Sequence, residues 1–227
     1  MKILVFAMEK EARPLLDEVS IKATKRNGYA TIYECDYLGH PFVIAISGIG
    51  KAFAASCIAS LANTYTIDYI VNFGVAGTLD AEQAPLLSAV IASSCVEHDM
   101  DTSQIGDPVG LVSGINLVYL PCSKELGKTM EKVCLEKGIP SAYGLISSGD
   151  TFFAPVDMRK TEVIKRYHPL CIDMESAPFA QIAYAYHIPF LAVRLVSDHL
   201  HPETEYAKNT PECARRIKEL ALHLLIS

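Results

Sequence analysis

The sequence lacks the marks of several large classes of protein. Its 227 residues are half hydrophobic, with only 13 glycines and 12 prolines, which excludes a collagen-like chain, a disordered chain and a coiled coil. Acidic residues outnumber basic ones by 26 to 20, so a nucleic acid polymer is not an expected partner. The apolar opening stretch stops at Glu9, too early for a secretion signal or a membrane span, so we expect no membrane association.

Cysteine is present but follows no disulfide or metal-binding pattern. The seven cysteines are scattered without Cys-x-x-Cys spacing, which favours buried free thiols and a cytoplasmic protein. The seven histidines lack the paired spacing of a zinc site, and His199 and His201 are too close together to lie one helical turn apart. The sequence therefore predicts no metal ion.

Apolar runs of strand length alternate with segments of helical period along most of the chain. Runs that are apolar on both faces are typical of a sheet covered on both sides. Residues 31–37 lead through Gly39 into the next run, which predicts an antiparallel hairpin and hence a mixed sheet. We predict a single α/β domain over residues 1–227, with three α/β/α layers. The expected strands are Lys2–Ala7, Thr31–Tyr37, Phe42–Ser47, Tyr69–Phe73, Ala89–Ser94, Cys171–Met174 and Phe190–Val196, and the expected helices are Glu9–Val19, Lys51–Asn63, Lys124–Lys137, Ser176–Tyr186 and Pro211–Leu225.

Three carboxylates, Glu11, Glu175 and Asp198, each follow a different predicted strand. Ligands of open α/β sheets bind beyond the carboxyl ends of the strands, so one pocket could receive all three. Close carboxylates push their pKa values apart, which lets them divide acid and base roles. The alternative is that each one caps the helix that follows it.

Two glycine-containing segments, Ser47–Lys51 and Gly74–Gly77, would let the backbone approach a ligand closely. Neither matches a nucleotide loop, because Ala45 and Ala52 stand where a triphosphate loop needs a glycine and a hydroxyl, and Gly74–Gly77 lacks the third glycine of a dinucleotide loop. ATP and NAD are therefore disfavoured, and tight turns without a ligand are the alternative.

An aromatic pair, Phe152 and Phe153, follows the turn at Gly149. An aromatic face beside free backbone groups suits a purine, although such a pair is more often core. A methionine such as Met174 is more often core packing than a sugar contact, and Arg194, near Asp198, could equally be half of a structural ion pair.

Seven motifs bring these segments together in one order. They are Ala7–Glu11, Ser47–Lys51, Asn72–Gly77, His98–Asp101, Ser148–Asp150, Asp173–Ser176 and Ser197–Asp198. Over about residues 1 to 200 this series resembles the 5′-methylthioadenosine/S-adenosylhomocysteine nucleosidases of the nucleoside phosphorylase superfamily. The resemblance implies a nucleoside phosphorylase-like fold, no cofactor, and hydrolysis of the N-glycosidic bond of 5′-methylthioadenosine and/or S-adenosylhomocysteine, which releases adenine and a 5-thioribose.

The resemblance gives catalytic roles to two residues. Asp198, oriented by Ser197, would be the general acid that protonates adenine at N7, which requires a raised pKa in a dry pocket. Glu11 would be the general base for the attacking water, and Arg194 would help to place that water. Carboxylates nearby would favour the positive charge that develops on the ribosyl ring.

The resemblance also implies substrate contacts. Glu175 would accept hydrogen bonds from the ribose hydroxyls, Met174 would pack on the sugar, Phe152 would stack on adenine and the Phe153 backbone would read the purine edge. Tyr206 would contribute to a lid. The remaining matched positions are Met8, Val75, which replaces a serine of some members, and Asp173, which replaces a frequent glutamate.

One departure from the family concerns His199, which directly follows the predicted acid. A cationic imidazole there would lower the pKa of Asp198 and oppose the acid role, unless it points to solvent.

The family forms homodimers in which the neighbouring subunit lines the 5′ pocket. The matching segment here is His98–Gly106, with Ile105 as its apolar contact. The resemblance therefore predicts a homodimer in which each 5′ pocket is completed by the other subunit.

Three alternative functions remain open. A phosphorylase of this fold needs a cluster of positive charge, and Lys10 stands between Glu9 and Glu11, so water is the expected nucleophile, although Lys51 and Arg194 keep the phosphorylase open. A futalosine-type nucleosidase would differ only at the 5′ pocket. A non-catalytic nucleoside-binding protein is disfavoured because all three carboxylates are present together.

Overall fold

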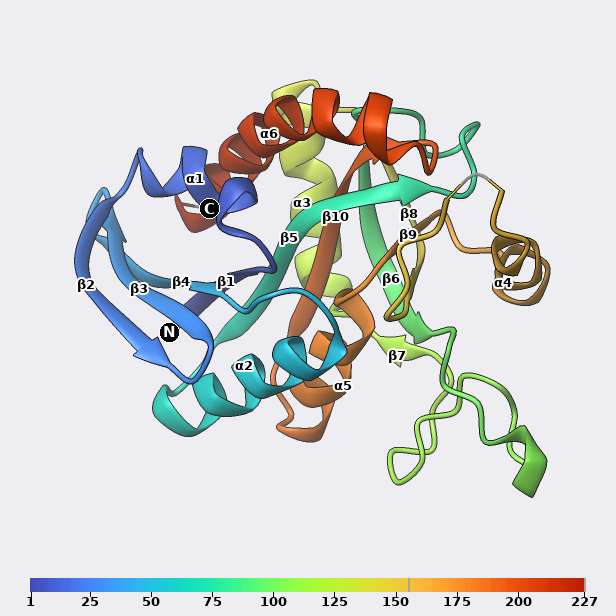
Figure 1. Cartoon of the computed structure of the whole chain (residues 1–227). Coiled ribbons are helices and arrows are strands. Elements are labelled where there is room, and N and C mark those ends of the chain that lie inside the picture. Colours follow the sequence, from blue (N-terminus) through green and yellow to red (C-terminus); the bar gives the residue numbers. More distant parts are fainter. Residues whose placement is uncertain (155, 227) are drawn as a thin grey trace.

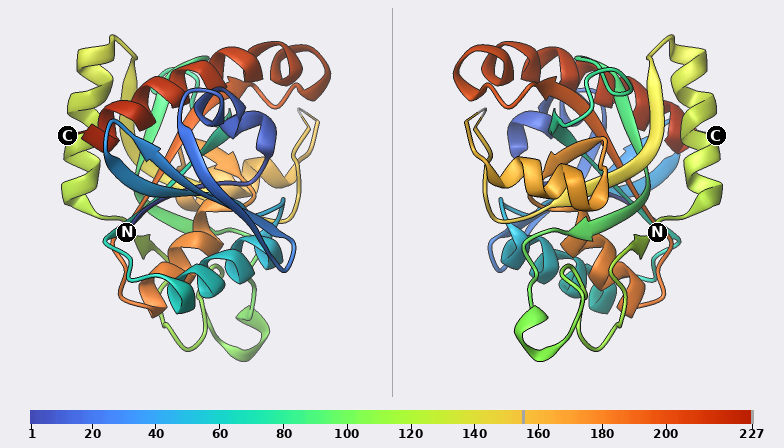
Figure 2. Two further views of the ribbon diagram at one scale, coloured as in Figure 1. Left: turned by 90° about the vertical axis from the view of Figure 1, so that its left-hand side faces the viewer. Right: turned by 90° about the vertical axis from the view of Figure 1, so that its right-hand side faces the viewer.

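The computed structural model describes residues 1–154 and 156–226, in which helices lie on both faces of a mixed sheet (Figure 1). The helices α1 and α6 pack together on one face, α2 and α5 pack together on the opposite face, and α3 packs against α6 (Figure 2). The helices are α1 (Glu9–Leu16), α2 (Lys51–Thr64), α3 (Lys124–Lys137), α4 (Arg159–Tyr167), α5 (Ser176–Ala185) and α6 (Ala207–Ile226), with short turns η1 (Ser103–Ile105) and η2 (Pro202–Tyr206). The strands are β1 (Lys2–Phe6), β2 (Ser20–Asn27), β3 (Ala30–Tyr37), β4 (His40–Ile46), β5 (Tyr69–Thr78), β6 (Ala89–Glu97), β7 (Leu120–Pro121), β8 (Ser141–Ser148), β9 (Cys171–Asp173) and β10 (Phe190–Asp198).

The strand β5 belongs to two parts of the sheet. Its first residues pair with β1, which continues through β4, β3 and β2 as an open sheet. Residues 70–77 of β5 pair with β10, and its last residues, Gly77 and Thr78, pair with β9. Because β10, β6, β8 and β9 are joined in that order, these strands close into a ring with β5. Closure brings the ends of β5, β9 and β10 to one place.

The predicted architecture is confirmed. The hairpin forms as expected, since β3 and β4 are antiparallel and pair Tyr37 with His40. The helix predicted at Lys124–Lys137 has those bounds in the structure. The strand β1 is completely buried from Ile3 to Phe6, as its apolar run on both faces requires.

Several predicted boundaries were wrong. Gly74–Gly77 is strand, not a loop, and β10 runs on to Asp198, because β5 and β10 stay hydrogen-bonded to each other over this stretch. The first helix ends at Leu16, and the last begins at Ala207 with Pro211 inside it. Four strands and α-helices were missed: β2 is an exposed, charged edge strand, β7 has only two residues, and β8 and α4 lack a long apolar run.

All seven cysteines are buried free thiols. Over residues 1–154 and 156–226, no helix is long and apolar enough to cross a membrane. In the same ranges, no group of three or more His, Cys, Asp or Glu side chains is arranged to hold a metal ion.

Candidate active site

A cavity opens where the ends of β5, β9 and β10 meet the start of α1. Its wall combines apolar side chains with a few convergent polar groups, as small-molecule sites do. The structure brings the predicted site residues together here, apart from Arg194 and Ile105. Those that line the cavity are Met8, Glu11, Val75, Phe152, Phe153, Asp173, Met174, Glu175, Ser197, Asp198 and Tyr206.

Glu11 both caps a helix and lines the cavity. It lies in the first turn of α1, where its Oε2 accepts a hydrogen bond from the Met8 amide at 3.0 Å. Its Oε1 accepts one from the Val75 amide at 2.9 Å. The side chain is buried, and this burial raises its pKa, against the opposing effects of the Arg194 charge and the two amides. The cap therefore fixes a carboxyl of raised basicity at the cavity wall.

Glu175 lies at the N-terminal end of α5, and its Oε1 accepts a hydrogen bond from the Gly50 amide at 2.9 Å. Burial raises the pKa of Glu175 to about 8, with Asp173 and Glu11 adding to the shift and Arg194 opposing it. This shift favours the protonated form of the carboxyl.

Asp198 ends β10 and is held at both oxygens. Its Oδ2 accepts a hydrogen bond from Ser197 Oγ at 2.7 Å, and its Oδ1 accepts one from the Leu200 amide at 2.8 Å. Burial raises its pKa, while these two hydrogen bonds lower it by a smaller amount.

His199 does not contact this carboxyl in the structure. Its Nδ1 lies 3.0 Å from Glu205 Oε2, and its backbone amide donates to the same oxygen at 2.7 Å. The charge of Glu205 raises the pKa of Asp198 and that of His199 lowers it, so the two effects oppose each other. The net pKa of Asp198 remains raised, as a general acid requires.

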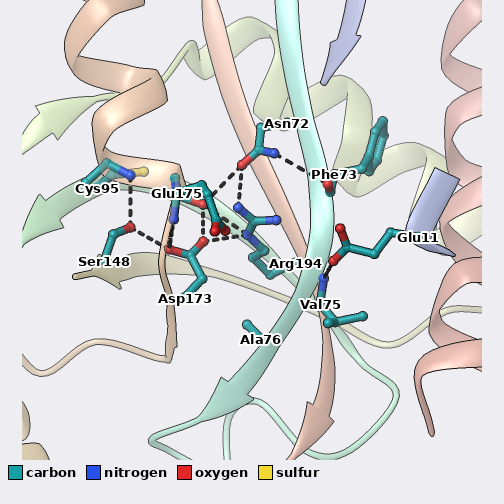
Figure 3. A network of polar contacts seen from close by, with 12 residues as sticks. Glu11, Asn72, Phe73, Val75, Ala76, Cys95, Ser148, Asp173, Glu175 and Arg194 are labelled. Atoms are coloured by element: carbon teal, nitrogen blue, oxygen red, sulfur yellow. Dashed lines mark hydrogen bonds and ion pairs between the residues drawn. The ribbon is translucent and has the colours of Figure 1, made fainter. Parts of the chain in front are cut away.

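Arg194 does not line the cavity and is fully buried in a network of polar side chains (Figure 3). Its Nε donates to Asp173 Oδ2 at 2.5 Å and to Ser176 Oγ at 3.0 Å, and its Nη2 donates to Asn72 Oδ1 at 2.5 Å. The structural ion pair that the sequence allowed for Arg194 is therefore formed, with Asp173 as the partner. Its charge also lowers the pKa of Glu11 and of Glu175, so it acts on the cavity electrostatically.

Asp173 is the hub of the same network. Besides Arg194, its carboxylate accepts hydrogen bonds from Ser148 Oγ at 2.5 Å and from Ser176 Oγ. The backbone amides of Glu175 and Ser176 also point to its Oδ1, at 3.2 Å each. These bonds hold the start of α5, and with it Glu175, against the end of β8.

The glycines of β5 make room for the protein's own side chains. A Cβ atom at Gly74 would collide with Arg194 Nη1 and lie 3.0 Å from Glu11 Oε1. A Cβ atom at Gly77 would lie 3.3 Å from Asp198 Oδ1 and closer still to Leu200. The sequence suggested that these glycines let the backbone approach a ligand; in the structure they make room for Glu11 and Asp198, which line the cavity.

Aromatic and apolar side chains form the outer wall. Phe152 is about half exposed, and its ring meets that of Tyr206 edge to face at 5.8 Å between centroids. The Tyr206 hydroxyl lies 3.7 Å from Met8 Sδ, and the Lys10 ammonium lies 4.5 Å from the Tyr206 centroid. Phe153 turns inward instead, and packs on the ring of His98 at 5.4 Å.

Ile105 does not reach this cavity. It lies in η1, within the segment that projects from the body of the molecule (Figure 1), and is 82% exposed. Sequence reasoning missed Ile49, Ile172 and Leu200, which also line the cavity. The motif at Ser47–Lys51 contains Ile49 and could have indicated it, whereas nothing in the pattern marked Leu200.

Comparisons with known proteins agree with this fold. Residues 2–226 match the family described as the phosphorylase superfamily. A 5′-methylthioadenosine/S-adenosylhomocysteine nucleosidase of Staphylococcus haemolyticus is 32% identical over 197 residues, which cover 86% of this chain and 85% of the relative. The chain therefore belongs to the phosphorylase superfamily and, within it, to the 5′-methylthioadenosine/S-adenosylhomocysteine nucleosidases.

Two solved structures are similar over nearly their whole lengths. A 5′-methylthioadenosine/S-adenosylhomocysteine nucleosidase from S. pneumoniae, solved with a transition-state inhibitor, has a TM-score of 0.88 and 28% identity, and the match covers 99% of this chain and 98% of that one. A futalosine hydrolase of Helicobacter pylori has a TM-score of 0.88 at 23% identity, with 97% of each chain covered. The second match shows the shared fold alone.

Proposed function

We propose that this protein hydrolyses the N-glycosidic bond of 5′-methylthioadenosine and/or S-adenosylhomocysteine, releasing adenine and a 5-thioribose. The observation that carries the proposal is that Glu11, Glu175 and Asp198, from three separate elements, line one cavity. All three have raised pKa values because they are buried. Such an arrangement supplies both an acid and a base to a single ligand.

Asp198 is proposed as the general acid. Burial raises its pKa, which favours the protonated form that a general acid needs, and Ser197 fixes the carboxyl orientation. Transfer of this proton to N7 of adenine lets the base leave as a neutral molecule. The bond between ribose and base then breaks with its electron pair on adenine.

Glu11 is proposed as the general base. Its burial makes the carboxylate a better proton acceptor than one in water, and the Val75 and Met8 amides hold it in place. It would take one proton from a water molecule whose oxygen bonds to the anomeric carbon. The Arg194 charge opposes the effect of burial and favours the ionised form of Glu11, which is the form that can accept this proton.

The remaining wall residues divide between sugar and base. Glu175 would bind the ribose hydroxyls and Met174 would pack on the ring, while Phe152 would stack on adenine and the Phe153 backbone would bind the purine edge. The half-exposed Phe152 ring at the wall and the buried Phe153 side chain support this division. Asp173 is reassigned from substrate contact to support of Glu175, because its oxygens are already occupied.

Water is favoured over phosphate as the nucleophile. Among the described residues that line the cavity, none is a lysine or an arginine. Arg194 is bound to Asp173, and Lys51 is bound to Glu97 and Asp99. A phosphate dianion would therefore face carboxylates with no cation to bind it.

We also propose that the protein is a single-domain, cytoplasmic homodimer. The exposed Ile105 on the projecting segment is suited to line the 5′ pocket of a neighbouring subunit, beside the apolar wall of Met8, Ile49 and Tyr206. Seven buried free thiols suit a reducing compartment.

The test is adenine release by the purified protein from 5′-methylthioadenosine, S-adenosylhomocysteine and futalosine, first in phosphate-free buffer and then with phosphate added. We expect release from one or both adenosine thioethers without phosphate, and a loss of roughly 100-fold or more in Asp198→Asn. Strict dependence on phosphate would indicate a phosphorylase. A preference for futalosine would change the substrate, and binding without release would indicate a non-catalytic protein.

A further inference from the structure

Lys51, at the end of the Ser47–Lys51 motif, has no role in the proposed chemistry. The motif His98–Asp101, at the start of the projecting segment, has none either. The structure joins them. Lys51 Nζ lies 2.8 Å from Asp99 Oδ1 and 3.2 Å from Glu97 Oε2. The other Asp99 oxygen, Oδ2, accepts a hydrogen bond from the Asp150 amide at 2.9 Å. Asp150 Oδ1 in turn accepts one from the Lys51 amide at 2.8 Å.

These contacts form a closed ring, which we call the Lys51–Asp99–Asp150 clasp. Its members come from three distant parts of the chain: the first residue of α2, the segment after β6 and the segment after β8. The side chains of Lys51 and Asp99 are 24% and 33% exposed, so solvent screens their ion pair less than it screens a fully exposed pair. The sheet pairs β6 with β8 as far as Glu97 and Ser148, and the clasp ties the two segments that follow them to the first residue of α2.

The residues next to Lys51 and Asp150 along the chain connect the clasp to the cavity. The residue before Lys51 is Gly50, whose amide donates to Glu175 Oε1 at 2.9 Å. The residues after Asp150 are Thr151, Phe152 and Phe153, which line the cavity. A change in the clasp therefore moves the Gly50 amide, which holds Glu175, relative to the proposed purine-binding segment Thr151–Phe153.

The fit at this junction is tight. Gly50 has φ of +93°, a conformation that favours glycine, and a Cβ atom there would lie 3.0 Å from Asp150 Oδ1. The turn is therefore shaped to bring the Gly50 amide to Glu175 while the next amide binds Asp150.

We propose that Lys51 and Asp99 are positioning residues for N-ribosyl hydrolysis, which hold the purine-binding segment Thr151–Phe153 in register with Glu175 so that base and ribose bind together. This inference rests on the proposed function and adds two residues to it. Neither residue lines the cavity, and each acts through Asp150 and Gly50. Loss of register weakens the binding of the whole nucleoside, because the base and the sugar can no longer both reach their partners.

The test uses the full-length protein with Asp99→Asn, Lys51→Met and the conservative Lys51→Arg. We expect Asp99→Asn and Lys51→Met each to raise KM for 5′-methylthioadenosine about tenfold while kcat changes less than about threefold. The double variant should show no further rise in KM, since either change opens the same ring. Lys51→Arg, which can keep both ion pairs, should stay within about threefold of the wild type.

A purely structural role has a different signature. It would lower the melting temperature and the yield of active enzyme but leave KM of the active fraction unchanged. Asp68→Asn is the matched control. It also removes an aspartate that forms a 2.8 Å ion pair, but the partner is the N-terminal amine, and neither Met1 nor Asp68 lines the cavity. If Asp99→Asn does not fold, Lys51→Met carries the same expectation.

The outcomes separate this inference from the function on which it rests. A wild type that releases no adenine under any condition overturns both. A wild type that is active, with a KM that neither Asp99→Asn nor Lys51→Met changes, overturns the positioning role alone. Additive rises in KM in the double variant would also overturn it, since they would mean that the two residues act separately.

Discussion

Arg194 and Asp173 form a 2.5 Å ion pair in which both side chains are almost wholly buried, at 1% and 2% exposure. Neither charge has water to solvate it, so each depends on the other and on Asn72, Ser148 and Ser176 around them. Asp173 lines the cavity and Arg194 holds it from outside the lining, so the integrity of the pair bears on both stability and activity.

Breaking this pair from one side should be costly. Arg194→Met leaves the Asp173 carboxylate buried without its cation, and we expect a loss of about 3–5 kcal/mol in the free energy of unfolding. Denaturant titration measures this loss. The double variant Arg194→Met with Asp173→Asn should recover part of it, because no unpaired charge remains. If the double variant is as unstable as the sum of the two single ones, the two residues do not act as a pair.

Ser197→Ala should move the pH dependence of activity upward. The Ser197 hydroxyl stabilises ionised Asp198, so its removal raises the pKa of Asp198 further. A general acid must be protonated, so the alkaline limb of the kcat/KM profile should shift to higher pH. Steady-state rates across the pH range in the wild type and Ser197→Ala measure the shift. A limb that moves downward or stays in place would contradict the assignment of Asp198 as the acid.

Stability should fall as pH rises through the neutral range. Because the folded pKa of Glu175 is about 8 and its ordinary value is 4.5, the folded protein holds a proton between these values that the unfolded chain has lost. The contribution of Glu175 is therefore complete below about pH 4.5 and is lost by about pH 8. Glu11 and Asp198, whose pKa values are also raised, act in the same direction.

The control for this pH effect is Glu175→Gln, whose amide oxygen can still accept from Gly50. It should flatten the decline in the free energy of unfolding and be more stable than the wild type above pH 8. Urea titrations at several pH values would show it. A wild-type stability that rises between pH 5 and 8 would count against buried, protonated carboxyls in the cavity.

Ile105→Asp should weaken binding of apolar 5′ groups if the projecting segment lines a neighbouring pocket. We expect a severalfold rise in KM for 5′-methylthioadenosine, since a charge would replace apolar contact at the thioether. Kinetics combined with sedimentation separate loss of contact from loss of the dimer. An unchanged KM in a dimeric Ile105→Asp protein would remove Ile105 from the site.

The thiols should resist modification while the protein is folded. Burial raises the pKa of Cys57 and Cys213 to about 12, and that of Cys35 to about 11, so little thiolate is present near neutral pH. A colorimetric thiol reagent at pH 8 should label the native protein slowly and label all seven cysteines in denaturant. Rapid labelling of one native thiol would reveal an opening that the structure does not show.

The parts of the fold and site that depend on local sequence patterns were predicted from the sequence. It identified the covered mixed sheet, the hairpin and most helices, because these depend on local apolar patterns. It also selected Glu11, Glu175 and Asp198 before any geometry was known, since polar residues at strand ends are conspicuous beside apolar runs.

What escaped the sequence depends on long-range closure. No local pattern shows that β9 returns to pair with the end of β5, so Gly74–Gly77 was assigned to a loop and its glycines to ligand contact. The partner of Arg194 was equally hidden, because Asp173 is distant along the chain and reaches it only through the ring of strands. Lys51 was considered only as a weak phosphate ligand, and its bond to Asp99 gives it another role.

The double membership of β5 has a consequence for how the molecule comes apart. One strand, β5, is hydrogen-bonded into both the open sheet and the ring. If either part unfolds and takes β5 with it, the other part loses the hydrogen bonds of an inner strand. We therefore expect heat to produce one cooperative transition, with no intermediate in which half of the chain stays folded. The cavity is built on that shared strand, so binding of a ligand there should raise the melting temperature of the whole chain.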